Sequence, residues 1–368
     1  MKLDDNTVFN VIGSGVSSWI AVLYLVHAGK SVVMHRDPNV IIRRIGESTV
    51  PYINEIACML EMTDDEFLER VNGHFKYGTF FRGWNNDSWL YYFANELDNV
   101  NATTQRQTFA YHIDAPGFCD LMLDHCSKFN NFTLIDEPFD VENYSTEEFY
   151  IDATGQQGIL ASKVGVEHKD TDFLLNDHAW IGNAAPGYKP YTESKAMTAG
   201  WLWNISLRTR MSYGYVFSSK YISIEDARKE FVEYTGIEPE KLIPFKSRRP
   251  IRQWKDNVLA LGMSAGFIEP LNATANFASQ ATIKTFLKTM DRPEVFNRVM
   301  KQTYDGVHKW IRTLYAMNTI ENSAYWDEYK KYRPQAERDL THYSKVGHIG
   351  LMGKHSWNLL KTNMLDRR

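Results

Sequence analysis

Three kinds of residues in this chain could do chemistry without a metal. The stretch GSGVSS, with Gly13 and Gly15, is a turn of the type that can hold a dinucleotide. Lys76 in HFKYG is an amine among aromatic residues, and Trp201 and Trp203 in GWLWNIS place two indoles two residues apart. Each also has an ordinary structural explanation, so the surrounding elements must decide between the two.

The tryptophans predict an aromatic wall. In an extended strand, positions i and i+2 point to the same face, so Trp201, Trp203 and Ile205 would stand together. Ordinary core packing is the alternative, because tryptophan carries a large apolar surface. The wall therefore borders either a core or an active site.

The glycine turn lies in a strand–turn–helix–strand context. Residues 7–12 and 31–34 read as strands, and residues 17–28 carry a helical apolar pattern. The two glycines permit a tight turn and a close pyrophosphate, while Ser18 stands at the third, small-residue position. The helix would present free N–H groups to the phosphates. We expect Asp37 to contact the ribose; the alternative is a βαβ unit without a dinucleotide.

Two later stretches favour a flavin. IDATG places small residues 152–155 at a strand end, and LALGMSAGFIEPL puts a strand at 259–262 before a small-residue turn. This order of turns looks like the FAD frame of aromatic hydroxylases.

The predicted fold class is α/β: an aromatic-hydroxylase-like, FAD-binding βαβ frame with a second β-sheet and a C-terminal helical region, interwoven in one unit. We expect an FAD-binding core over residues 1–300, with the substrate sheet inserted in the flavin frame, and a helical region over 301–368 packed on it. The coarse elements behind this prediction are a helix at 54–72, strands at 75–93 broken by an Asn-Asn-Asp turn, a helix at 118–129, hairpin-like strands at 132–152, a second sheet within 188–224, a strand within 252–263 and helices from 274 onward.

Composition excludes several functions. The 368 residues carry 41 basic and 45 acidic side chains with no basic block, which argues against a nucleic-acid groove. Cys58, Cys119 and Cys126 have neither disulfide-framework nor metal-site spacing, so no metal is expected. The polar N-terminus is not a signal peptide, and no apolar run could span a membrane. We expect a soluble cytoplasmic protein.

Seven stretches in matching order carry a specific resemblance. They are GSGVSSW, RRIGESTVP, VNGHFKYGTFFRGW, AYHIDAPGF, GWLWNIS, GYVFSS and AGFIEPL. Together they resemble the flavin-dependent halogenases, specifically the tryptophan-halogenase family. The chain is short for that family and is similar to short forms in marine phages and bacteria.

The resemblance implies that Lys76 is the catalytic residue. Reduced FAD, O2 and halide (bromide, iodide or chloride) would yield hypohalous acid, which reaches the lysine beside an electron-rich aromatic substrate. The lysine would either hydrogen-bond the hypohalous acid or become a haloamine. The alternative for a lone lysine in an aromatic strand is a snorkelling surface residue.

The resemblance also assigns the wall and a strap. Trp201, Trp203 and Ile205 would separate flavin from substrate, with Ser206 where the family has proline. RRIGESTVP would be the strap between the two sites; the alternative is a polar turn closed by a proline. We expect a structural hydrogen bond from His112. The implied flavin contacts are Gly13, Ser14, Gly15, Val16, Ser17, Ser18, Asp37, Val40, Glu47, Ser48, Met263, Gly266 and Asn276.

The resemblance implies that Thr274 and Ala275 contact the halide, at the start of a helix whose N–H groups attract anions. Because alanine adopts positive φ less readily than the glycine of the family, we expect a looser or larger halide site. Asn272 stands beside the wall where tryptophan-specific members have a catalytic glutamate; its alternative role is a helix N-cap. Losing that base argues against free tryptophan as the dedicated substrate and favours phenols and indoles. Glu269 would be structural.

Two rival functions remain: an FAD-dependent aromatic monooxygenase, and a non-catalytic flavin-binding protein. Lys76 and the tryptophan wall favour the halogenase over the monooxygenase. Because only one dinucleotide-type turn occurs, we expect reduced FAD to come from a separate NAD(P)H flavin reductase. The sequence does not determine the aromatic substrate, the site of attack, the preferred halide, whether the protein is a homo-oligomer, or what replaces the family glutamate.

Overall fold

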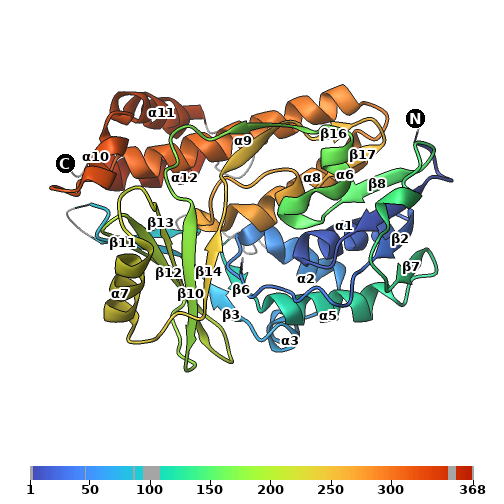
Figure 1. Ribbon diagram of the computed structural model, residues 1–368, viewed down its shortest axis with the longest axis horizontal. Helices are drawn as coiled ribbons and strands as arrows, with labels where there is room; N and C mark the ends of the chain where they lie inside the picture. Colours follow the sequence, from blue (N-terminus) through green and yellow to red (C-terminus); the bar gives the residue numbers. More distant parts are fainter. Residues whose placement is uncertain (1–2, 46, 86–87, 94–107, 347–353, 367–368) are drawn as a thin grey trace.

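A computed structural model describes residues 3–45, 47–85, 88–93, 108–346 and 354–366. It places a mainly parallel sheet beside a second, antiparallel-rich sheet, with the C-terminal helices lying along both (Figure 1). Gly46 of the predicted strap and residues 86–87 of the predicted turn lie outside the described residues. The predicted fold class is confirmed. None of the helices in the described ranges is long and apolar enough to cross a membrane.

The first sheet contains the predicted βαβ unit. Helix α1 (Val16–His27) connects two parallel strands, and a third parallel strand pairs with the first on its other side. The sheet order is β16-β17-β8-β1-β2-β7, with β1 (Val8–Ile12), β2 (Ser31–His35), β7 (Phe132–Ile135), β8 (Phe149–Asp152), β16 (Trp254–Lys255) and β17 (Val258–Ala260). The hairpin expected at 132–152 is wrong, because β7 and β8 each pair in parallel with a different strand.

Helix boundaries follow their caps. The helix predicted at 54–72 is split into α2 (Asn54–Met59) and α3 (Asp64–Arg70), because Thr63 caps α3 through a capping box. Helix α5 (Ala115–Cys126) begins earlier than expected because the Asp114 carboxylate accepts from an N–H of its first turn. Short helix α6 (Ile159–Lys163) follows β8.

The second sheet carries the tryptophan strand at its centre. Its order is β14-β10-β13-β12-β11-β4-β5, with β4 (Gly78–Arg82), β5 (Trp89–Tyr92), β10 (His178–Ala184), β11 (Thr192–Met197), β12 (Gly200–Ser206), β13 (Met211–Phe217) and β14 (Lys241–Pro244). Helix α7 (Ile224–Thr235) covers the outer face, where Phe231 packs on Leu202 and Tyr215. The strand pattern did not predict this helix, which begins after the Ser223 cap.

Two small ribbons complete the strands. β3 (His74–Lys76) pairs antiparallel with β6 (Ala110–His112), and β9 (Glu167–Asp170) pairs with β15 (Arg248–Arg252). The first ribbon matters most for the site, because it carries the lysine predicted to be catalytic.

The C-terminal part is helical, as expected. Helix α8 (Thr274–Lys288) packs on α1, and α9 (Pro293–Ala316), α10 (Ala324–Lys330), α11 (Arg333–Val346) and α12 (Lys354–Lys361) follow. Helix α9 runs across residue 300, the predicted division of the chain, which stays a prediction.

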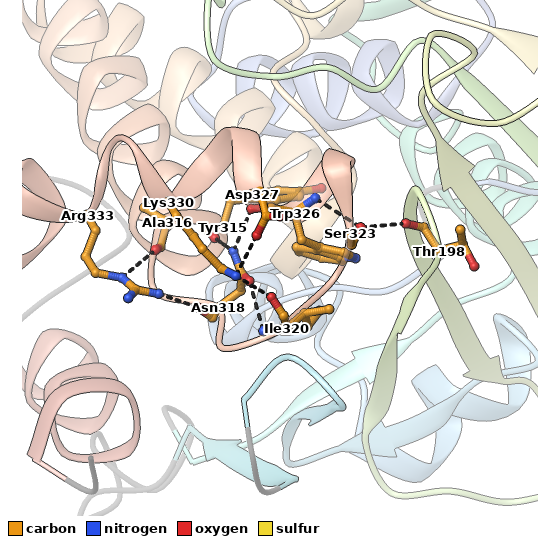
Figure 2. A network of polar contacts seen from close by, with 10 residues as sticks. All are labelled: Thr198, Tyr315, Ala316, Asn318, Ile320, Ser323, Trp326, Asp327, Lys330 and Arg333. Atoms are coloured by element: carbon orange, nitrogen blue, oxygen red, sulfur yellow. Dashed lines mark hydrogen bonds and ion pairs between the residues drawn. The ribbon is translucent and has the colours of Figure 1, made fainter.

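The α9–α10 loop is anchored to the second sheet (Figure 2). Arg333 Nη2 donates to the Asn318 carbonyl at 2.6 Å, and Ser323 Oγ donates to the Thr198 carbonyl at 3.3 Å. The C-terminal helices are therefore held against the turn between β11 and β12.

Candidate active site

Three glycine-containing turns meet at the carboxyl ends of the parallel strands. Gly13 has φ of 144°, and a Cβ there would lie 2.5 Å from the carbonyl oxygen of Ala153. Gly262 has φ of 61°, and a Cβ there would lie 2.4 Å from Ser17 Oγ. Only glycine fits at either position, so the turn after β1 packs against both the ATG turn and the turn after β17.

The first turn of α1 is open to a phosphate. Gly15 is its N-cap, and within the described part of the chain no side chain caps the helix and a Cβ on Gly15 would meet no atom within 4 Å. Ser18, at the third small position, is fully buried and donates its hydroxyl to the Gly15 carbonyl at 2.6 Å. The unpaired N–H groups and the space in front of them fit the pyrophosphate of FAD.

Asp37, the residue expected at the ribose, lies just beyond β2 with the predicted flavin contact Val40. Ser14 Oγ donates to the Asp37 carbonyl at 3.1 Å, which holds the end of β2 against the glycine turn. Arg36 is not free at this edge, because it forms a bidentate ion pair with Asp136. Val40, a few residues on, is 50% exposed.

Asp152 fixes this end of the frame, a role that the sequence left unassigned. Its buried carboxylate accepts from the N–H groups of Leu160 and Ala161, both at 2.8 Å, and from Ser264 Oγ at 3.1 Å. The acid inside IDATG, directly after a buried strand, was the available signal. Asp152 thus holds the ATG turn to α6 and to the turn after β17.

A narrow cavity brings the predicted flavin and halide residues together. Met263, Gly266, Thr274, Ala275 and Ser17 all line it, and its volume is about 40 Å³. That volume exceeds the space that one water needs, so a halide ion can be accommodated. Asn276, the other predicted contact on α8, is buried in the helix's first turn.

The start of α8 corrects two expectations. Asn272 and Ala273 are the residues with positive φ, at 60° and 56°, whereas Ala275 already lies inside the helix. Alanine at 275 therefore needs no unusual backbone, and this reason for a looser halide site is wrong. Asn272 is also not the N-cap, since Ala273 takes that position and no side chain caps α8.

Asn272 is instead a buried amide. It is 7% exposed, and within the described residues neither Oδ1 nor Nδ2 has a hydrogen-bond partner. A buried, unsatisfied amide is costly, and such groups require an explanation. A ligand that offers it a donor or an acceptor would remove this cost.

Lys76 lies inside the protein. It is 1% exposed, its Nζ donates to the Thr49 carbonyl at 2.8 Å, and it lies 5.0 Å from the centre of the Phe93 ring. Burial lowers the pKa of this amine to about 7. The snorkelling-surface alternative is therefore wrong.

The tryptophan wall stands on the inner face of the second sheet. Trp201 pairs with Ala196 and Trp203 with Ser194 across β11, and the two indole centres are 6.1 Å apart. Trp201, Trp203 and Ile205 are 2%, 5% and 6% exposed. The outer face belongs to α7, so the wall faces the interior of the protein.

The strap residues join β11 of the second sheet to the β3–β6 ribbon. Ser48 forms an isolated bridge with His112, and its hydroxyl shares a 2.7 Å hydrogen bond with Thr192 Oγ1. His112 Nε2 is hydrogen-bonded to the same hydroxyl at 2.9 Å, and burial holds its pKa well below the usual range. The predicted structural hydrogen bond of His112 is confirmed, and Thr192 is a residue that the sequence did not single out.

A buried ion cluster holds the strap from the other side. The guanidinium of Arg210 contacts the Glu47 carboxylate and, at 2.7 Å, Asp114 Oδ1. Glu47 is fully buried, and burial raises its pKa to about 7 although Arg210 opposes the shift. In the structure the Glu47 side chain anchors the strap; its contact with flavin stays a prediction.

Glu269 is a second buried carboxylate at the wall. Its Oε1 accepts from Trp201 Nε1 at 2.6 Å and from the Tyr315 hydroxyl. Asn176 continues this chain, donating to the Tyr315 hydroxyl at 2.9 Å and accepting from the Tyr325 hydroxyl at 2.8 Å. Burial raises the pKa of Glu269 to about 7, and the expected structural role is confirmed.

A larger cleft lies elsewhere. Its volume is about 780 Å³, and its lining includes Lys195 from β11, Glu233 and Tyr234 from α7, and Tyr325 from α10. Neither Lys76 nor the wall lines it. Size alone therefore does not identify the chemical site in this fold.

Comparisons with known proteins find similar sequences and similar folds. The family model for tryptophan halogenase matches residues 8–126 and 93–361, which together span most of the chain. Tryptophan 7-halogenase KtzQ from Kutzneria sp. (strain 744) is 24% identical over 421 residues, covering 88% of this chain and 79% of the relative.

Solved structures share the fold. A tryptophan halogenase from Shewanella frigidimarina superposes with a TM-score of 0.87 at 20% identity, covering 98% of this chain and 89% of the other. The flavin-dependent halogenase BrvH from Brevundimonas sp. BAL3 superposes with a TM-score of 0.83 at 19% identity, covering 98% and 90%.

Proposed function

This chain belongs to the tryptophan halogenase family and is therefore a flavin-dependent halogenase; we propose that it halogenates an electron-rich phenol or indole through Lys76. The observation that carries this proposal is the buried Lys76 amine, which donates a hydrogen bond to the carbonyl of Thr49 in the strap. The balanced reaction consumes reduced FAD, O2, halide and a proton, and yields oxidised FAD, hypohalous acid and water. The hypohalous acid and the arene then give aryl halide and a second water.

The cofactor fits the glycine turns. The open first turn of α1 would hold the pyrophosphate, and the turn carrying Met263 and Gly266 would lie along the flavin ring. When bound, reduced FAD supplies two electrons toward the reduction of O2, and the halide supplies the other two. Thr274 and Ala275 would offer their backbone N–H groups to the halide in the same cavity.

The Lys76 side chain is suited to hypohalous acid in either protonation state. Because its pKa is about 7, the ammonium and the neutral amine are both populated near neutral pH. The ammonium donates a hydrogen bond that polarises the O–halogen bond, and the amine can accept the halogen as a haloamine. In both cases a dry surrounding keeps the oxidised halogen from escaping into water and from stray nucleophiles.

The wall and Asn272 set the substrate class. Trp201 and Trp203 keep the arene away from the flavin, so that halide is oxidised first. Asn272 cannot act as a base, whereas a phenol or an indole loses its ring proton readily after attack. The buried amide supports a substrate with its own polar group, since it has no partner in the described residues.

The test is a product assay by mass spectrometry. The purified protein is supplied with FAD, an NAD(P)H flavin reductase, O2 and each halide, over a panel of phenols, indoles and free tryptophan, with catalase present. Lys76→Met removes the amine and keeps most of the side-chain volume. Lys128→Met, at an exposed position two residues after the end of α5, is the matched control.

A halogen mass shift that is present in wild type and the control, and absent in Lys76→Met, supports the proposal. Hydroxylated product without halogen would instead establish the monooxygenase. Flavin binding with no product on any substrate would establish the non-catalytic alternative.

A further inference from the structure

The turn between β12 and β13 contacts the strap, the start of α5 and the segment before β3. We propose that Arg210 is a positioning residue that sets the strap, and through it the Lys76 amine, in place relative to the tryptophan wall. This inference rests on the proposed function for its activity readout, and it has a second readout that does not.

Arg210 joins three separate segments. It lies at the end of the turn that connects β12 to β13, and it is 6% exposed. One terminal nitrogen, Nη2, contacts Glu47 in the strap, and the other, Nη1, contacts Asp114 at the start of α5. Both carboxylates are buried, with side chains 1% and 8% exposed, so neither charge is compensated by water.

The same turn also holds the approach to β3. Arg208 N donates to the Asn72 carbonyl at 2.9 Å, and Arg208 Nε donates to the Gly73 carbonyl at 3.1 Å. Asn72 and Gly73 directly precede the strand that ends at Lys76. The β12–β13 turn therefore contacts both the strap and the segment that leads into β3, the strand that carries Lys76.

The strap connects the Arg210 contact at Glu47 to the hydrogen bond that holds the Lys76 amine. Glu47 O accepts from Ile113 N at 2.8 Å, and two residues later the Thr49 carbonyl accepts the Lys76 hydrogen bond at 2.8 Å. A shift of the strap at Glu47 would thus move the acceptor that holds Nζ. A catalytic group misplaced by about 1 Å can lower the rate about 100-fold. Loss of the Arg210 anchor should therefore lower the rate of arene halogenation.

Arginine is needed for geometric reasons. The two carboxylates approach different nitrogens of one rigid, planar guanidinium. A lysine has one ammonium on a flexible stem and cannot hold both carboxylates in the same arrangement. Arg210→Lys therefore keeps the positive charge and removes the two-nitrogen contact with Glu47 and Asp114. It separates the effect of geometry from the effect of charge.

The first readout is coupling. Reduced FAD is mixed with O2, bromide and a phenol; flavin reoxidation is followed optically, and aryl bromide and free hypobromous acid, trapped by a 1,3-diketone, are quantified. For Arg210→Lys we expect reoxidation within twofold of wild type, aryl bromide per flavin at least fivefold lower, and more trapped hypobromous acid. Arg228→Lys, in an exposed ion pair with Glu238, is the matched control and should match wild type.

The second readout follows Lys76 directly. Wild type and variant are treated with limiting acetic anhydride, and acetylation of Lys76 is measured by mass spectrometry. Freed from the Thr49 carbonyl, Lys76 should be acetylated at least threefold faster in Arg210→Lys, with surface lysines unchanged. This comparison stands even if the wild-type protein makes no halogenated product, which would overturn only the proposed function.

Glu47→Gln covers the case in which Arg210→Lys does not fold. It keeps the shape of the strap anchor and removes its charge, and we expect the same changes in smaller size. Unchanged Lys76 acetylation and unchanged coupling in a folded variant would overturn the inference. So would a loss of product that only tracks a loss of flavin reoxidation.

Discussion

Burial of the Lys76 amine is expected to lower the stability of the folded protein at neutral pH. Its pKa is about 7 in the folded protein against an ordinary value of 10.5, and the cause is burial. Between these two values the unfolded chain binds more protons than the folded one, so the free energy of unfolding should rise with pH. Lys76→Met removes the ionisable group and with it this pH dependence.

The size of the effect follows from the two pKa values. The penalty of burying Lys76 is about 4 kcal/mol at pH 7, about 3 kcal/mol at pH 8.5 and about 1.5 kcal/mol at pH 9.5. The variant also leaves the Thr49 carbonyl without this donor, which costs about 1–3 kcal/mol at every pH. We therefore expect Lys76→Met to be the more stable protein at pH 7 and to lose this advantage by pH 9.5.

The assay is denaturant unfolding of wild type and variant at pH 7, 8.5 and 9.5 without added flavin. Other groups cancel in the difference between the two proteins, which should change by about 3 kcal/mol over this range. Lys128→Met, at an exposed position, should show a flat difference. A flat difference for Lys76→Met as well would refute the picture of a buried amine whose pKa is lowered to about 7.

Three further predictions concern the halide, the wall and the substrate. Bromide and iodide are easier to oxidise than chloride and should be turned over in the product assay; activity with chloride alone would contradict this. In Gly214→Ala the new Cβ would lie 1.9 Å from the Trp203 ring and displace it, which should lower the unfolding free energy by about 1–3 kcal/mol. With the wall displaced, more hypobromous acid should escape and be captured by the 1,3-diketone. Asn272→Glu places a carboxylate beside the substrate and should raise turnover of weakly activated arenes by about 10-fold or more, measured as initial rates; an unchanged preference for phenols would count against the assigned position of Asn272.

Local patterns predicted the parts of the site that depend on backbone form. The glycine turn, the paired tryptophans and the helix start at 274 each leave a signature within a few residues, and the structure has all three. The strand pairing at 132–152 left no such signature. A short apolar strand reads the same whether its partner precedes it in a hairpin or lies far away in a parallel sheet.

The ion cluster could not be read from sequence for a related reason. Arg210 is 163 positions from Glu47 and 96 positions from Asp114, and nothing at any of the three marks the others. The backbone at Asn272 and Ala273 was likewise hidden, because asparagine adopts left-handed geometry only occasionally and alanine rarely does. Tertiary contacts, rather than local preference, set these positions.

Glu269 has a consequence for attempts to recombine this protein with its relatives. One buried oxygen accepts both from Trp201 in the second sheet and from Tyr315 in helix α9, while Glu269 itself precedes α8. A chimera in which the incoming segment lacks the matching residue at one of these three positions would leave a buried donor or a buried carboxylate unmatched, which costs several kcal/mol. Crossover points chosen only at strand and helix ends do not protect this junction. The segments around residues 201, 269 and 315 should be inherited as one block.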